Sequence, residues 1–136
     1  MKPKKILVDT SAWILSFKKS GPEELQTFLK NGIDQNIILT TPLVILELLQ
    51  GCKTEREYAE FKERFGSLDN CLLESIQWEK AYRFGFMLRK KGITVPTMDI
   101  LIAFLSIENG CVLLHHDNHF RLIAKHSDLE ALDFLT

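Results

Sequence analysis

The chain has 136 residues, of which 46% are hydrophobic and 26% charged, a balance that is typical of one folded domain and excludes a disordered or fibrous chain. Its formal net charge of -1 argues against a nucleic-acid binder that depends on a broad positive field, so local basic patches or a metal ion would have to hold any nucleic acid. Three separated cysteines without a CxxC pair, and no apolar run that could span a bilayer, indicate a soluble cytoplasmic protein with free thiols.

Hydrophobic periodicity and turn residues predict strands that alternate with helices. We expect strands at residues 6–8, 37–39, 71–73, 111–114 and 129–133. Between the first two strands we expect helices at 10–17 and 20–32, with Gly32 as C-cap, and after the second strand a helix from Pro42 to near Gly51 and another after a capping box at 54–57. The remaining helices are expected at 75–91, from a Thr97 cap to an end at Gly110, and at 120–125. This order predicts a single domain over residues 1–136, a three-layer α/β/α fold with a short parallel sheet.

Aromatic residues are expected mainly in the core. Tyr58, Phe61 and Phe65 recur at helical spacing, which favours packing against the interior. Trp13 and Trp78 are also assigned to the core, with stacking on bases as the less favoured alternative.

Four acidic residues converge on one edge of the predicted sheet. Asp9 follows the first strand and Asp117 follows the fourth, so both lie at carboxyl ends, where open α/β sheets bind their ligands. Asp99 lies in the first turn of the helix that precedes the fourth strand, and Glu47 lies in the second turn of the helix after the second strand. Both helix positions face the same edge.

Each acid alone has an ordinary explanation, since Asp9 and Asp117 suit helix N-caps and Asp99 suits a first helical turn. Together, four carboxylates would repel one another and raise their pKa values unless a cation lies between them. Hard oxygen ligands favour Mg²⁺ or Mn²⁺. A zinc site built from the neighbouring histidines is less favoured, because His115 and His116 would point to opposite faces of a strand.

Four segments around these acids also carry a family resemblance. They are ILVDTSAWI (6–14), ILELLQG (45–51), PTMDILIA (96–103) and LLHHDNHF (113–120). In this order and spacing the chain resembles PIN-domain ribonucleases, specifically the VapC-type toxins of type II toxin–antitoxin systems.

The resemblance implies a Mg²⁺- or Mn²⁺-dependent endoribonuclease with Asp9, Glu47, Asp99 and Asp117 as its catalytic residues. Asp9, Asp99 and Asp117 are then the metal ligands, and Thr10, Ser11 and His119 support them. It implies an RNA substrate such as tRNA or rRNA, a cognate antitoxin protein and a homodimer. Many relatives carry a second aspartate where this chain has His119, which suggests one tightly held ion and a second recruited by the substrate.

Other functions stay open at this point. A housekeeping PIN nuclease in RNA maturation would have the same residues, and a non-catalytic RNA- or protein-binding module would have the same fold. Basic candidates for phosphate contact are Lys18, Lys19, Arg89, Lys90, Lys91 and Arg121. The apolar segments 43–49 and 58–65 are candidates for covering by a partner or for the interior.

Overall fold

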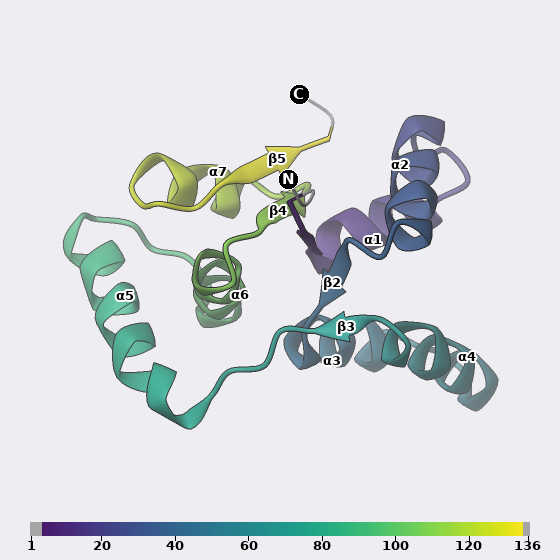
Figure 1. Cartoon of the computed structure of the whole chain (residues 1–136), viewed down its shortest axis with the longest axis horizontal. Coiled ribbons are helices and arrows are strands. Elements are labelled where there is room, and N and C mark those ends of the chain that lie inside the picture. The colour runs from purple at the N-terminus through teal and green to yellow at the C-terminus, as the bar shows by residue number, and fades with distance from the viewer. Residues whose placement is uncertain (1–3, 135–136) are drawn as a thin grey trace.

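The computed structural model describes residues 4–134, and within that range the chain forms five strands and seven α-helices (Figure 1). In chain order the elements are β1 (Ile6–Val8), α1 (Thr10–Phe17), α2 (Glu23–Asp34), β2 (Ile38–Thr40), α3 (Pro42–Gln50), α4 (Glu55–Gly66), β3 (Asp69–Asn70), the 3₁₀ turn η1 (Ser75–Gln77), α5 (Trp78–Lys90), α6 (Thr97–Glu108), β4 (Val112–His115), α7 (Asn118–Lys125) and β5 (Ala131–Asp133).

All strand pairs are parallel, and the strand order is β3-β2-β1-β4-β5. The central strand β1 aligns Leu7 with Leu39 on one side and with Leu113 on the other. Leu7, Val8, Leu113 and Leu114 are fully buried, because helices cover both faces of the sheet. The predicted three-layer α/β/α architecture is therefore confirmed.

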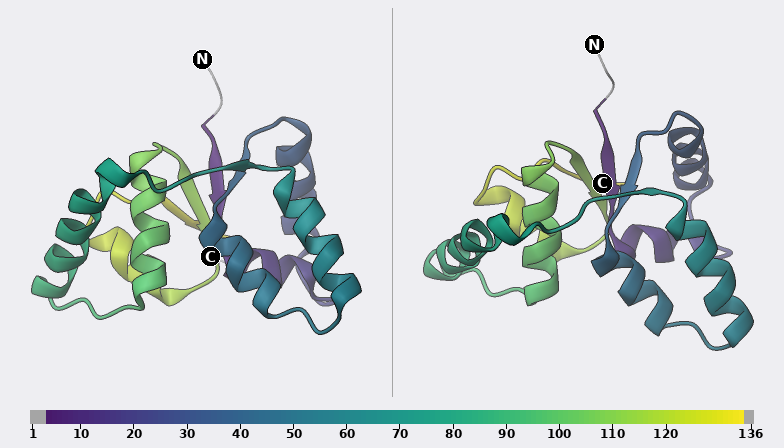
Figure 2. Two further views of the ribbon diagram at one scale, coloured as in Figure 1. Left: turned by 90° about the horizontal axis from the view of Figure 1, so that it is seen from below. Right: turned by 60° about the horizontal axis from the view of Figure 1, so that its bottom comes forward.

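The helices form two groups beside the sheet. Helix α6 packs on β4, and α5 lies on the outer side of α6 (Figure 2). Helix α3 contacts α1 and α6, and α4 packs against α3. None of the helices in the described part of the chain is long and apolar enough to cross a membrane.

Polar side chains begin several of the helices. The Thr54 hydroxyl accepts a hydrogen bond of 3.0 Å from the Glu57 backbone N–H, which is one half of the predicted capping box. Thr41 caps α3, whose first residue is Pro42.

The predicted strand at 71–73 is wrong. The third strand is Asp69–Asn70, which pairs with Leu39 and Thr40 although both of its residues are exposed. The Cys71 N–H still donates to the Thr40 carbonyl, and the chain then leaves the sheet. The apolar run 71–73 correctly predicted that Cys71 is buried, but the strand lies directly before this run.

Several predicted helix ends also differ, among them those at Gly32 and Thr97. Gly32 lies inside α2, which continues to Asp34. A Cβ at Gly32 would approach the Ile38 side chain to 2.7 Å, so the glycine serves the contact with β2 and not the end of the helix. Thr97 is the first residue of α6, and Pro96 occupies the N-cap position without a side-chain hydrogen bond.

The aromatic predictions hold in part. Phe65 and Trp13 are buried, and their rings meet edge to face with centroids 5.0 Å apart. Phe61 packs against the core, whereas Tyr58 and Trp78 are each 41% exposed. Cys71 and Cys111 are buried and Cys52 is half-buried, and all three are free thiols.

Candidate active site

The structure brings the four predicted acids together at the carboxyl edge of the sheet. Asp9 follows β1 directly, and Asp117 follows β4 after one intervening residue. Asp99 lies in the first turn of α6, and Glu47 lies in α3. The charges of Asp9, Asp99 and Asp117 all act on the Glu47 carboxyl, so the four side chains share one electrostatic environment.

Asp9 is both the N-cap of α1 and the most buried of the four acids, with 4% of the residue exposed. Its Oδ2 accepts hydrogen bonds from the Ser11 backbone N–H at 3.0 Å and from the Ser11 hydroxyl at 2.5 Å. These bonds hold the carboxylate in one orientation at the base of the site.

Ser11 also connects the two segments that carry acids. Its Oγ accepts a hydrogen bond of 2.9 Å from the backbone N–H of His116, in the loop between β4 and Asp117. The same hydroxyl therefore contacts Asp9 and positions the chain next to Asp117. This contact places Ser11 beside the acids, and its supporting role stays a prediction.

Thr10 positions Glu47. The Thr10 hydroxyl donates a hydrogen bond of 2.9 Å to Glu47 Oε1, which joins the first residue of α1 to the second turn of α3. Each of the two predicted hydroxyl residues thus contacts a different acid.

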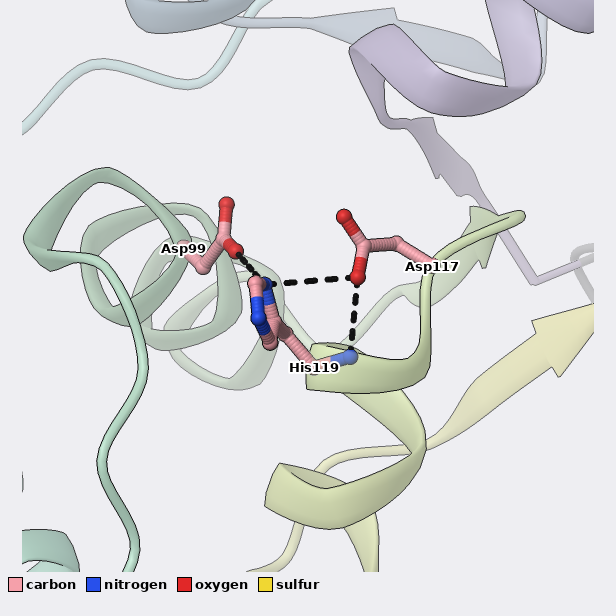
Figure 3. A group of neighbouring side chains, drawn as sticks. All are labelled: Asp99, Asp117 and His119. Carbon is pink, nitrogen blue, oxygen red and sulfur yellow. Dashed lines mark hydrogen bonds and ion pairs between the residues drawn. The ribbon is translucent and has the colours of Figure 1, made fainter.

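Asp99, Asp117 and His119 form a compact group of possible metal ligands (Figure 3). One ligand atom from each lies within 4.8 Å of those of the other two. The His119 ring stands between the carboxylates, with Nδ1 2.9 Å from Asp99 Oδ2 and 3.3 Å from Asp117 Oδ1. Asp117 also caps α7 by accepting the His119 backbone N–H at 2.9 Å.

Burial and repulsion between carboxylates weaken the acidity of Asp9, Glu47 and Asp99. Burial is the largest cause that raises the pKa values of Asp9, Glu47 and Asp99, and neighbouring carboxylates raise all three further. Hydrogen bonds oppose the shift, from Ser11 to Asp9, from Thr10 to Glu47 and from His119 to Asp99.

This donor set fits a hard divalent cation. Carboxylate oxygens from three segments lie near one another, and a cation between them would relieve the repulsion that raises their pKa values. The compact group contains Asp99 and Asp117 together with His119. Asp9 lies beside this group, since its charge acts on Asp99 and its own carboxylate is bonded to Ser11.

The neighbouring histidines do not combine into a zinc site. His115 is buried, and its Nδ1 accepts the Asp117 backbone N–H at 3.1 Å, whereas the His116 ring is half-exposed and contacts Asp133. Burial lowers the pKa of His115, which favours the neutral form of this ring.

Asp133 is the residue near this edge that the sequence analysis missed. It ends β5, with a buried side chain that pairs with Arg121 and His116. An acid at the end of an otherwise apolar strand was the available signal.

The basic candidates for phosphate contact lie on separate elements. Lys18 and Lys19 follow α1 and are exposed, and Arg89 and Lys90 lie in the last turn of α5.

The chain is similar to known proteins over most of its length. The profile of the PIN domain matches residues 6–126. A VapC ribonuclease from Mycobacterium bovis and ribonuclease VapC11 from Mycobacterium tuberculosis are each 28% identical to this chain over 134 residues, covering 95% of the chain and 98% of the relative.

Two solved structures have the same fold. VapBC2 from Rickettsia felis, bound to a DNA fragment from its promoter, superposes with a TM-score of 0.78 at 17% identity, over 95% of this chain and 98% of the other. DNA-bound VapBC from Salmonella typhimurium gives a TM-score of 0.78 at 19% identity, over 96% and 98%. With the profile match spanning most of the chain and the acids meeting at the sheet edge, this protein belongs to the PIN domain family.

Proposed function

We propose that this chain is a metal-dependent endoribonuclease and the toxin component of a toxin–antitoxin pair. The observation that carries the proposal is the convergence of Asp9, Glu47, Asp99 and Asp117 at one sheet edge, where their charges act on one another. Relatives that span nearly the whole chain are named VapC ribonucleases, which supports RNA as the substrate.

In this proposal Asp9, Asp99 and Asp117 hold a Mg²⁺ or Mn²⁺ ion, and His119 and Glu47 lie beside it. Such an ion supplies an activated water and polarises the scissile phosphate. A cation would stabilise the anionic form of Asp9 and Asp99, whose pKa values burial raises, so metal binding and the charge state of these acids are linked.

The protein's own contribution is orientation. Thr10 fixes Glu47, and Ser11 fixes Asp9 and the backbone that leads to Asp117, so acids from separate segments keep constant relative positions. Asp9 is nearly buried, while Asp117 and His119 are half-buried. The substrate phosphate would therefore approach from the side of α6 and α7.

Two apolar surfaces suit the protein partners. On α1 and α4, Ile14, Phe17 and Tyr58 are exposed, and Phe17 packs on Phe61 with ring centroids 5.4 Å apart. We assign this surface to the cognate antitoxin, in line with the VapBC complexes among similar folds. Exposed Tyr82 and Phe86 on α5 are assigned to a homodimer.

We further propose that residues 1–136 act as a single PIN domain in the cytoplasm, where the three free thiols would stay reduced.

The test is cleavage of a mixed pool of structured RNA by purified, antitoxin-free protein in Mg²⁺, Mn²⁺ or EDTA. Metal-dependent cutting that leaves 5′-phosphate ends, and falls at least about 100-fold in Asp99→Asn, is expected. Glu60→Gln is the matched control, because it removes one exposed carboxylate of α4 and should cut normally. Equal cutting by wild type and Asp99→Asn would contradict the assignment of the site.

A further inference from the structure

A second charged cluster lies at the same sheet edge and is not explained by metal binding. The Asp133 carboxylate accepts from Arg121 through Oδ2, with Nε at 2.9 Å, and its Oδ1 lies 3.2 Å from His116 Nδ1. The Arg121 Nη2 contacts Oδ2 as well, so the guanidinium meets this oxygen through two nitrogens. Arg121 comes from α7, Asp133 from β5 and His116 from the loop after β4.

Asp133 is held firmly by the sheet. Its backbone pairs in register with His115 of β4, and only 5% of its side chain is exposed. A carboxylate buried to this degree is costly unless charged or polar donors satisfy it, so Asp133 fixes the plane of the Arg121 guanidinium. The anchor is rigid, and the arginine takes its orientation from it.

The guanidinium keeps donors for another anion. Arginine has five N–H donors in a planar fork, and the two bonds to Asp133 use Nε and Nη2. The Arg121 side chain is 43% exposed, which leaves its remaining donors within reach of a solute. Because the guanidinium is already oriented before an anion binds, less side-chain conformational entropy is lost on binding.

Arg121 belongs to the helix that begins at the acidic site. It follows the N-cap residue Asp117 by four residues, a backbone rise of about 6 Å along α7. The charges of Asp133, Asp9, Arg121 and Asp117 all act on the ring of His115. A positive group therefore stands beside an edge that otherwise repels a polyanion.

We propose that Arg121, oriented by the buried Asp133, binds a non-scissile phosphate of the RNA strand next to the acidic site. Arg121 is then a substrate-binding residue, and Asp133 is a positioning residue that acts through it. The inference rests on the proposed function, because it takes RNA as the substrate. It adds a contact that would direct the RNA strand along α7. Phosphate recognition by a planar guanidinium carries no base preference.

The test measures binding of a fluorescein-labelled pool of random single-stranded RNA oligonucleotides by anisotropy, over a range of salt concentrations in Mg²⁺. All proteins carry Asp99→Asn, which keeps the probe uncut. The main variant is Arg121→Met with Asp133→Asn, which removes the pair together, leaves no unpaired buried carboxylate and keeps the net charge unchanged. Lys125→Ala, one turn further along α7, is the control for a nearby exposed cation.

We expect the double variant to bind the pool roughly tenfold more weakly than its parent, since a hydrogen bond to a charged group is lost. The slope of log Kd against log salt should fall by about 0.7, the amount for one phosphate contact on a single strand. Lys125→Ala should change neither. Arg121→Lys, made alone in the same parent, keeps the positive charge. It should therefore retain part of the affinity and the full salt slope.

A purely structural ion pair gives a different result. The double variant would then show an altered melting temperature with the parental affinity and salt slope, and the inference would be wrong. A parent protein that does not bind the pool would also overturn it. Failure of the nuclease proposal is seen separately, as wild-type protein that binds RNA through Arg121 but does not cut it.

Discussion

The Ser11 hydroxyl accepts a hydrogen bond of 2.9 Å from the backbone N–H of His116, a residue 105 positions further along the chain. Because the same hydroxyl donates to Asp9, one small side chain couples the start of α1 to the loop that leads to Asp117. The site is thus held together by polar contacts between elements that are adjacent in the sheet.

Ser11→Ala should therefore disturb both stability and activity. Losing the hydroxyl leaves the His116 N–H and Asp9 with one partner fewer, and we expect a loss of about 1–2 kcal/mol in unfolding free energy, measured by urea denaturation. RNA cleavage should fall as well, and Ser11→Thr should restore most of both. Ser67→Ala also removes one side-chain hydrogen bond, to the Arg64 carbonyl at the end of α4, and should leave cleavage unchanged.

Asp9→Asn should stabilise the metal-free protein increasingly as pH rises. Burial raises the pKa of Asp9, so the folded state holds this proton more tightly than the unfolded state. Unfolding then releases a proton at any pH between the ordinary value of 3.8 and the raised one, and the wild type loses stability as pH increases through that window. Asparagine does not titrate and still accepts from Ser11.

The measurement is urea unfolding of both proteins in EDTA over a series of pH values from below 3.8 to neutrality. Asp34→Asn makes the same replacement at the exposed end of α2 and is the control. A difference between Asp9→Asn and wild type that stays constant with pH would contradict the burial argument.

Mn²⁺ or Mg²⁺ should stabilise the wild-type protein by binding only its folded state. At a concentration 100 times the dissociation constant, the gain is about 2.7 kcal/mol, visible as a higher melting temperature. Asp99→Asn should lose most of this gain, since Asp99 belongs to the compact ligand group. Equal stabilisation of both proteins would place the metal elsewhere.

His119→Asp should exchange stability for metal affinity. A further carboxylate between Asp99 and Asp117 would repel both, so the metal-free protein should melt at a lower temperature. The carboxylate introduced by this substitution also adds an oxygen ligand for Mg²⁺. We expect it to tighten Mg²⁺ binding roughly tenfold, as measured by calorimetry. His126→Asp makes the same replacement at the exposed end of α7, and unchanged Mg²⁺ binding is expected there.

The layered fold and the position of the acids could be predicted because they depend on local patterns. Residues 10–17 form a helix with the predicted bounds, and Asp9 and Asp117 follow buried aliphatic runs that are central strands. Parallel strands bring such positions to one edge whatever their separation in sequence.

Features that depend on contacts between distant segments were missed. The polar strand Asp69–Asn70 forms because β2 offers it an unpaired edge, and nothing in its two residues favours a strand. Gly32 reads as a helix end until the approach of Ile38 is known. The pairing of Asp133 with Arg121 likewise depends on β5 lying beside α7, a tertiary relationship that neither residue signals alone.

Two of the acids are also helix caps, and this second role limits which substitutions can remove the site's charge without destabilising the fold. Asp9 and Asp117 each accept a backbone N–H at the start of a helix while supplying charge to the site. Alanine would remove both roles at once, whereas asparagine keeps the cap and removes only the charge. Relatives that keep this fold but have lost the proposed nuclease activity should therefore be enriched in asparagine at these two positions.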